Sequence, residues 1–166
     1  MKSHVAWWVA LFLCFGLSAA HASLPKADLV VVKKSQYSLE LLKDGKPIKR
    51  FWIALGQNPK GAKLRKGDLK TPEGRYLLDY KKDSSGYYKA IHISYPNLND
   101  LRRAREYGVE DPGSMVMIHG QPNRLPEDEP AVQNSNWTNG CIALLNHEMD
   151  ELWQMVDPGT PIEIRP

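Results

Sequence analysis

The chain has 166 residues and a net charge of +3, and its 22 basic and 19 acidic side chains are interspersed along it. Because no basic cluster stands out, the charge pattern argues against a nucleic-acid-binding surface. The sequence has no CxxC or HExxH pattern for a metal ion and no GxGxxG or Walker pattern for a nucleotide. We therefore expect no metal ion and no cofactor.

Residues 1 to 22 have the features of a secretory signal peptide. Lys2 provides the positive start, Val5 to Ala20 is apolar and uncharged, and Ala20-His21-Ala22 fits the small-x-small cleavage rule. We expect cleavage before Ser23 and export of the remaining chain. The alternative is an uncleaved membrane anchor, although the apolar segment is a little short for a span of about 20 residues.

Residues 23 to 166 would then form the mature protein, a single domain of about 144 residues. Cys14 leaves with the signal peptide, so Cys141 is the one cysteine of the mature chain. A lone thiol in an oxidising compartment cannot form an intramolecular disulfide and risks oxidation. Such a thiol is more often used chemically than merely packed.

Three strands are expected near the start of the mature chain, at Asp28 to Lys33, Tyr37 to Leu42 and Ile48 to Leu55. Between the second and the third, Asp44-Gly45 is the residue pair that tolerates the positive φ values of a tight hairpin turn. This region predicts a β scaffold.

A polar, glycine-rich loop from Gly56 to Gly74 follows, and a loop of this length in a compact domain is often functional. Tyr76 to Tyr80 and Ala90 to Tyr95 are then expected to be strands. A short helix should begin after Pro96 with Asn97 or Asn99 as its cap and extend to Tyr107.

His92 lies inside the second of these strands, with its side chain on the opposite face from Ile91 and Ile93. It is either part of the wall of a catalytic cleft or an ordinary strand histidine. Of the two interpretations we favour the ordinary strand histidine.

The stretch from Met115 to Asn146 carries one histidine and one cysteine, each where an apolar run meets a polar loop. His119 follows the run Met115 to Ile118, which predicts a buried strand, and Cys141 precedes a second apolar run. A nearby imidazole can take the proton of a thiol and stabilise the thiolate, and such a pair suits acyl transfer.

Gly140 permits a tight turn before Cys141 and could present N–H groups to a developing oxyanion. The alternative is that Cys141 is a small buried side chain and His119 a core histidine with its hydrogen bonds satisfied. The free thiol of an exported chain favours the catalytic interpretation.

The rest of the chain supplies a second long loop and the C-terminal elements. Asn123 to Trp137 joins the two reactive residues and could lie over them as a lid. Asn146 to Val156 has the spacing of an amphipathic helix, with Asn146 as a plausible cap, and Pro161 to Arg165 predicts a final strand.

The mature chain resembles the YkuD-type L,D-transpeptidase family over nearly its whole length. The resemblance implies a mainly β, sandwich-like fold with one or two short helices. It is carried by three motifs, which are Gly67-Asp68 to Thr71-Pro72-Glu73-Gly74, His92-Ile93-Ser94-Tyr95-Pro96-Asn97, and His119-Gly120 followed by Thr138-Asn139-Gly140-Cys141.

By this resemblance Cys141 is the nucleophile, His119 is the general base and acid, and the carbonyl of Gly120 orients the imidazole. Backbone N–H groups around Gly140 and Cys141 would hold the oxyanion. The residues expected at the substrate or the oxyanion are Gly140, Thr138, Asn139 and His92.

The resemblance also implies an enzyme of the periplasm or cell wall, with a part in peptidoglycan biosynthesis and cell shape. The thiolate would attack a meso-diaminopimelate carbonyl of a stem peptide and release the terminal D-alanine. The acyl acceptor would be a second stem peptide, a D-amino acid or a lipoprotein lysine. Two departures, Asn139 for the commoner histidine and Ala143 for Asn or Arg, leave the acceptor open. The alternatives are an amidase or hydrolase that releases a wall-linked lipoprotein, and a non-catalytic wall-binding domain.

Overall fold

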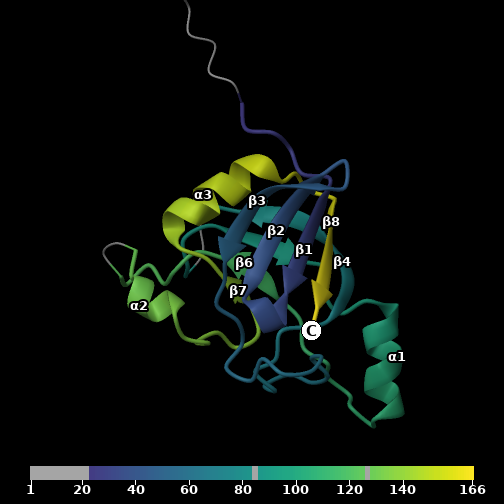
Figure 1. The fold of residues 1–166 in the computed structure, drawn as a ribbon. Helices are drawn as coiled ribbons and strands as arrows, with labels where there is room; N and C mark the ends of the chain where they lie inside the picture. The colour runs from purple at the N-terminus through teal and green to yellow at the C-terminus, as the bar shows by residue number, and fades with distance from the viewer. Residues whose placement is uncertain (1–22, 84–85, 126–127) are drawn as a thin grey trace, which may run out of the picture.

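An eight-stranded β-sheet runs through the residues that the computed structural model describes, 23–83, 86–125 and 128–166 (Figure 1). The strand order is β3-β2-β1-β8-β4-β5-β6-β7. This mainly β architecture confirms the fold class expected from the sequence. The strands are β1 (Leu29–Lys33), β2 (Ser38–Lys43), β3 (Lys46–Trp52), β4 (Gly74–Lys82), β5 (Ala90–Ile93), β6 (Met117–His119), β7 (Ile142–Ala143) and β8 (Thr160–Arg165).

The strands β1, β2 and β3 form an antiparallel meander, which confirms the three predicted strands and the hairpin between the second and the third. Asp44 and Gly45 make the turn between β2 and β3 with φ values of 51° and 72°. A left-handed backbone costs glycine nothing and aspartate little, which is why this dipeptide specifies the hairpin. A short 3-10 helix, η1 (Lys34–Gln36), links β1 to β2.

The last strand of the chain returns to the first, because β8 pairs in parallel with β1 and antiparallel with β4. Val30 lies opposite Ile162 and Val32 opposite Ile164, and all four side chains are buried. The first and last segments of the described chain therefore hold the middle of the sheet together.

The two ends of the sheet approach each other, so that the sheet curls around one core. Ala54, just after β3, exchanges two backbone hydrogen bonds of 2.9 Å with Ala143 of β7. Figure 1 shows β1 and β2 in front of β6 and β7. The fully buried side chains come from both halves and include Leu39, Leu41, Phe51, Leu78, Ile91, Ile118, Ile142 and Leu144.

The helix α1 (Leu98–Glu106) is capped as the sequence predicted. The Asn97 side chain accepts hydrogen bonds from the N–H groups of Asn99, at 2.9 Å, and Asp100, at 3.1 Å. Two N–H groups that the first helical turn leaves unpaired are satisfied in this way.

The helix α3 (Asn146–Met155) begins differently from the prediction. Its capping position is Leu145, and Asn146 turns its side chain to accept a hydrogen bond of 2.9 Å from the Gln121 N–H. The expectation of an Asn146 cap was therefore wrong. The caps are supplied by Glu148, which accepts from the Leu145 N–H, and by Asp128, which accepts from the Asn146 N–H.

A third helix, α2 (Pro130–Gln133), lies in the segment that the sequence predicted to be a loop. The predicted signal peptide, residues 1 to 22, lies outside the described residues. Among the residues that are described, no helix is both long and apolar enough to cross a bilayer.

Candidate active site

His119 and Cys141 leave two adjacent strands on the same face. The strands β6 and β7 pair in parallel, with Ile118 opposite Ile142 and His119 opposite Ala143. Both isoleucines are fully buried in the core, so the alternation along a strand turns His119 and Cys141 to the other face. The two residues are diagonal neighbours on paired strands, and an aromatic side chain such as an imidazole is long enough to span that spacing.

The imidazole of His119 is held in one orientation in a dry environment. Its Nδ1 lies 2.6 Å from the carbonyl oxygen of Gly120. Since a carbonyl oxygen only accepts, Nδ1 carries the proton and Nε2 is the acceptor of the neutral ring. Tyr87 stacks on the ring at 4.2 Å between centroids, and Trp137 meets it edge-on at 5.6 Å.

His119 is only 3% exposed, and this burial lowers its pKa to about 4, against the opposing effect of the Gly120 hydrogen bond. A neutral imidazole is the form that can accept a proton. At neutral pH the ring is therefore in the protonation state that a general base requires.

Gly120 must be a glycine for steric reasons. A Cβ on this residue would come within 2.6 Å of the Tyr88 carbonyl oxygen and the Asn146 side chain. The Gly120 N–H donates a hydrogen bond of 2.7 Å to the same Tyr88 carbonyl. The strand β6 can thus end with its carbonyl turned toward the imidazole because no side chain occupies this position.

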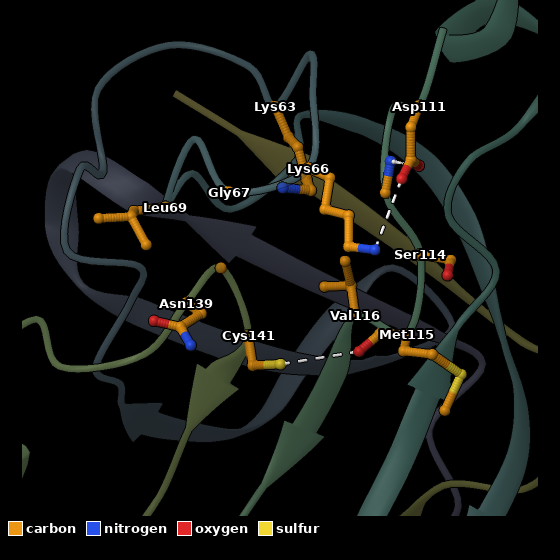
Figure 2. Close-up of a pocket in the computed structure, with 12 residues that line it drawn as sticks. Lys63, Lys66, Gly67, Leu69, Asp111, Ser114, Met115, Val116, Asn139 and Cys141 are labelled. Carbon is orange, nitrogen blue, oxygen red and sulfur yellow. Dashed lines mark hydrogen bonds and ion pairs between the residues drawn. The ribbon is translucent and has the colours of Figure 1, made fainter.

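The thiol of Cys141, on the same face of the strand pair as His119, points into a pocket (Figure 2). The Met117 N–H donates to Sγ at 3.4 Å, and Sγ lies 3.9 Å from the Met115 carbonyl oxygen. Burial raises the pKa of Cys141, while the Met117 N–H and the positive charge of Lys63 act in the opposite direction. The resting site thus combines a protonated thiol with a neutral imidazole.

The residues before the cysteine fix its backbone. Thr138 is buried, and its Oγ1 donates to the Cys141 carbonyl at 2.7 Å and accepts from the Gly140 N–H at 3.1 Å. Gly140 has a φ of +128°, and a Cβ there would lie 2.6 Å from the Lys70 carbonyl oxygen. Asn139 lines the pocket and accepts a hydrogen bond of 3.2 Å from the Gln57 side chain.

The pocket beside the thiol has a volume of about 550 Å³. The glycine-rich loop, Gly56 to Gly74, forms one wall, and the segment between α1 and β6 forms the opposite wall (Figure 2). The sequence left open whether this loop reaches the site, and the structure places it there. Residues that line the pocket include Lys63, Lys66, Leu69, Asp111, Met115 and Cys141.

Asp68 holds the loop in shape. Its carboxylate accepts hydrogen bonds from the N–H groups of Leu64, Arg65 and Lys70 and from the ammonium of Lys63, at 2.8 to 3.1 Å. Burial acts to raise the pKa of Asp68, but these four donors outweigh it and hold the pKa below its usual range. The loop is therefore ordered by one carboxylate rather than by regular secondary structure.

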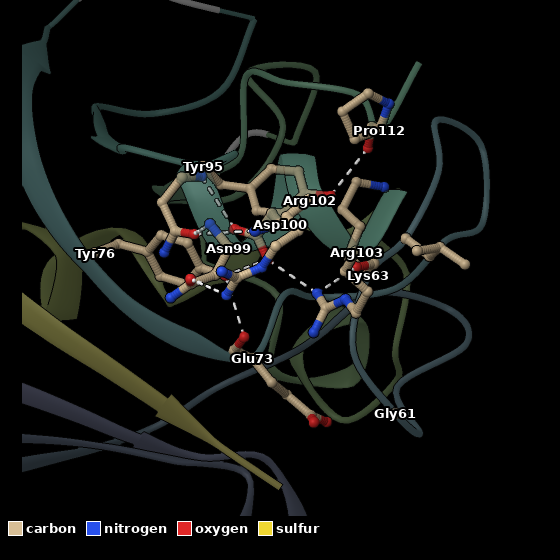
Figure 3. A network of polar contacts seen from close by, with 12 residues as sticks. Gly61, Lys63, Glu73, Tyr76, Tyr95, Asn99, Asp100, Arg102, Arg103 and Pro112 are labelled. Atoms are coloured by element: carbon tan, nitrogen blue, oxygen red, sulfur yellow. Dashed lines mark hydrogen bonds and ion pairs between the residues drawn. The ribbon is translucent and has the colours of Figure 1, made fainter. Parts of the chain in front are cut away.

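The helix α1 supports the same wall from behind (Figure 3). Arg103 donates a hydrogen bond of 3.0 Å to the carbonyl of Lys63 and pairs with the buried Asp100 at 2.9 Å. Asp100 also accepts from the Tyr76 hydroxyl of β4 at 3.3 Å. The loop wall is thus connected to the sheet through α1.

His92 lies away from the pocket lining. Its Nδ1 pairs with Asp79 at 2.7 Å, and its ring stacks on Tyr80 at 4.6 Å between centroids. It faces Met117 in the register of β5 and β6, on the side of the sheet that carries the thiol. His92 thus has partners of its own in Asp79 and Tyr80.

No group of His, Cys, Asp or Glu side chains among the described residues could hold a metal ion. A family model for the L,D-transpeptidase catalytic domain, YkuD, matches residues 27–164. The chain belongs to this L,D-transpeptidase family. The match spans β1 through β8, so it includes both reactive residues and both walls of the pocket.

Similar proteins include a protein of Escherichia coli (strain K12) described as "Putative L,D-transpeptidase YafK", which is 38% identical over 78% of this chain and 42% of its own length. The Bacillus subtilis protein YqjB is 28% identical over 85% of this chain and 73% of its own. The solved structure of Pgp2, a helical cell shape determining protein from Campylobacter jejuni, superposes with a TM-score of 0.65 at 28% identity and covers 86% of this chain. This chain spans about half of Pgp2 and less than half of YafK.

Sequence reasoning missed three residues that shape the site of this family member, which are Lys63 and Asp111 in the pocket and Tyr87 over the imidazole. A single lysine among 22 basic residues gives no signal of its own. Tyr87 precedes β5, which pairs with β6, and it lies 32 residues before His119 in the chain. Only the register of the sheet brings it to His119.

Proposed function

We propose that this protein is an exported cysteine acyltransferase that acts on peptidoglycan stem peptides by L,D-transpeptidation. The observation that carries the proposal is the pairing of a pocket-facing thiol, Cys141, with a neutral imidazole on the same face of β6 and β7. Membership of the L,D-transpeptidase family supports the choice of substrate class. Export rests on the predicted signal peptide, and it places the reaction in the periplasm or cell wall.

In the first step, Nε2 of His119 takes the thiol proton as Sγ attacks the carbonyl of a meso-diaminopimelate residue. Neither group is charged at rest, so the ion pair forms only when a substrate is in place. The Gly120 carbonyl stabilises the imidazolium through the Nδ1 proton. The tetrahedral intermediate then collapses, the leaving D-alanine amine takes the proton from His119, and a thioester remains on Cys141.

We assign different roles to the backbone N–H groups of Gly140 and Cys141, both of which the sequence suggested for the oxyanion. The Gly140 N–H already donates to Thr138 Oγ1, so we assign it the role of fixing the turn. The N–H of Cys141 remains as the backbone donor next to the reacting carbon. A donor held by a rigid turn is worth most because it needs no rearrangement when charge develops.

An amine then attacks the thioester after His119 has removed its proton, and the new amide leaves as Cys141 recovers the proton. Stem peptides that contain meso-diaminopimelate are the acceptors for wall cross-linking. Water in the same place would make the protein a hydrolase, which includes the alternative of an amidase that frees a wall-linked lipoprotein. The choice between these acceptors is a matter of what enters the pocket after the first product leaves.

The test is to incubate the protein with purified tetrapeptide-bearing muropeptides and to analyse the products by mass spectrometry. Cross-linked dimers and free D-alanine are expected, and neither should form with Cys141→Ala. Shortened or released stems without cross-links would make the protein a hydrolase of the same site. Products that persist in Cys141→Ala would overturn the proposal.

A further inference from the structure

A buried ammonium stands beside the nucleophile, and the steps above do not use it. The Lys63 side chain is only 5% exposed, although it lines the same pocket as the thiol (Figure 2). Burying a charge is costly unless it has partners, so a lysine in such a position needs a reason. The hydrogen-bond partners of the Lys63 ammonium show what bonding capacity remains for a ligand.

The ammonium of Lys63 is incompletely satisfied by the protein. It donates to Asp68 Oδ1 at 2.8 Å and to the Arg65 carbonyl at 3.1 Å. An ammonium has three N–H donors, and among the described residues these two oxygens are its acceptors. One donor is therefore left for a ligand in the pocket.

Asp68, the carboxylate that pairs with Lys63, is also shared with other hydrogen-bond donors. Asp68 accepts from three backbone N–H groups in addition to the ammonium. Its negative charge is spread over four donors, so Lys63 keeps part of its attraction for another anion. Asp68 in this arrangement positions the lysine and leaves it available.

The position of the ammonium relative to the thiol restricts which anion can bind. The Nζ atom lies 3.9 Å from the point where a Cβ on Gly140 would stand, and Gly140 adjoins Cys141. In a peptide whose final residue is the leaving group, the terminal carboxylate lies within roughly 5 Å of the attacked carbonyl carbon by standard bond lengths. A carboxylate on Lys63 therefore fits an attacked carbonyl at Sγ.

The other charges of the pocket agree with an anionic ligand. Lys66 and Asp111 lie 3.6 Å apart at the rim and are mostly exposed, at 78% and 63% (Figure 2). Exposed pairs of this kind contribute little binding energy and rearrange easily. Among the charged residues that line the pocket, Lys63 is the buried one, and Arg103 of α1 holds its carbonyl.

We propose that Lys63 is a specificity-determining residue that binds the terminal α-carboxylate of the donor stem peptide. This assignment rests on the proposed function, because it takes the residue after the attacked carbonyl as the leaving group. It makes the enzyme selective for donors that end one residue beyond that carbonyl. A longer stem would place an uncharged amide against the ammonium and would bind less well.

The test compares two synthetic donors, a stem tetrapeptide ending in D-alanine and the same peptide ending in D-alaninamide. Binding is measured by titration calorimetry on Cys141→Ala, in which no reaction interferes. We expect the free acid to bind about tenfold more tightly than the amide, the range of a charge-assisted hydrogen bond. Equal binding of the two peptides would overturn the role of Lys63 without any second variant.

A second pair of variants locates the effect. On the same background, Lys63→Met should remove the preference for the free acid, and Lys66→Met should keep it, because that lysine is exposed at the rim. Thermal unfolding of Lys63→Met shows whether the loop survives the loss of the Asp68 pair. A preference retained by a folded Lys63→Met protein would refute the assignment.

Failure of the proposed function gives a different pattern. If wild-type protein forms no thioester with either donor but still binds the acid tenfold better, the protein recognises stem termini without catalysis. If both donors acylate Cys141 at equal rates and bind equally, catalysis stands and the carboxylate site does not.

Discussion

His119 and Cys141 share one face of β6 and β7, but their surroundings on that face are built in opposite ways. His119 is enclosed by the rings of Tyr87 and Trp137, and its Nδ1 donates to the Gly120 carbonyl. Cys141, by contrast, opens onto a pocket of about 550 Å³ with charged walls. The base is kept dry and neutral, and the nucleophile is kept accessible. Proton transfer by His119 is thus kept apart from substrate recognition in the pocket at Cys141.

The largest effect should follow from removing the base. We expect His119→Gln to lower the rate of Cys141 acylation by about 10²- to 10⁴-fold, the usual range for a general base. Single-turnover acylation followed by quenched mass spectrometry measures this rate. His92→Gln is the matched control on the same sheet and should change the rate by less than tenfold. A drop at His92 as large as that at His119 would put a second imidazole in the chemistry.

The turn before the nucleophile should be the next most sensitive point. Gly140→Ala forces a residue with a Cβ to a φ of +128° and against the Lys70 carbonyl. We expect a loss of roughly 2–4 kcal/mol in the free energy of unfolding, measured by urea denaturation, together with loss of acylation.

Gly45→Ala serves as the control for Gly140→Ala. Its φ is also positive, at +72°, but nothing lies within 4 Å of the added methyl group. A cost of only about 1–2 kcal/mol is expected there, with acylation unchanged. Equal costs at the two positions would mean that the close approach to Lys70 is not important.

The dry environment of His119 should also affect the pH dependence of stability. The pKa of His119 is about 4 in the folded protein and near 6.5 in an unfolded chain. The unfolded state therefore binds a proton that the folded state does not between these values. Stability should be complete above about pH 6.5 and should fall toward pH 4, by up to roughly 3 kcal/mol for this group.

The comparison of wild-type protein with His119→Gln isolates that contribution, because the variant should lack this part of the acid-side loss. His147→Gln is the contrasting control. Its imidazole is exposed and its pKa is raised by the hydrogen bond to Asp128, so it adds stability at low pH and loses it as pH rises. Denaturation of the three proteins at pH 7, 5.5 and 4.5 gives the result. An unchanged slope in His119→Gln would contradict the assigned pKa.

The smallest expected effect concerns Trp137, one of the two rings that enclose the imidazole of His119. Trp137→Ala should admit water to the imidazole and raise the pKa of His119 by about one unit, as its burial is the main cause of the low value. Trp137→Phe keeps an aromatic ring and should leave the pKa nearly unchanged. Titration of the His119 ring by NMR distinguishes the two. If the pKa stays near 4 in Trp137→Ala, Tyr87 and not Trp137 is the ring that shields the imidazole of His119 from water.

Local patterns predicted the elements of this fold well. The β-branched runs, the Asp44-Gly45 turn and the Asn97 cap depend on neighbours in the chain, and the structure has them. The Asn146 cap failed because a distant group, the Gln121 N–H, competes for that side chain. Cys141 and His119 were identified from residue type and position, but their placement on one face depends on strand register.

The sequence did not predict which residues line the pocket, for a similar reason. Lys63 is buried because Asp68 folds the loop around it, and Arg103 on α1 holds the loop from outside. The Lys63–Asp68 pair lies within the loop, but the Arg103 contact joins residues 40 positions apart in the chain, which no local pattern encodes. The prediction that the Gly56 to Gly74 loop would be functional identified the region that lines the pocket, but it did not identify Lys63.

The central claim is that Cys141 forms a thioester with the stem peptide and releases its terminal residue. The most direct measurement is the intact mass of the acid-quenched protein after incubation with a stem tetrapeptide, with the adduct located by peptide mapping. We predict a mass increase equal to the tetrapeptide minus D-alanine, on Cys141, with free D-alanine formed in the same reaction. Release of D-alanine by a protein in which Cys141 has been replaced by alanine would contradict the account.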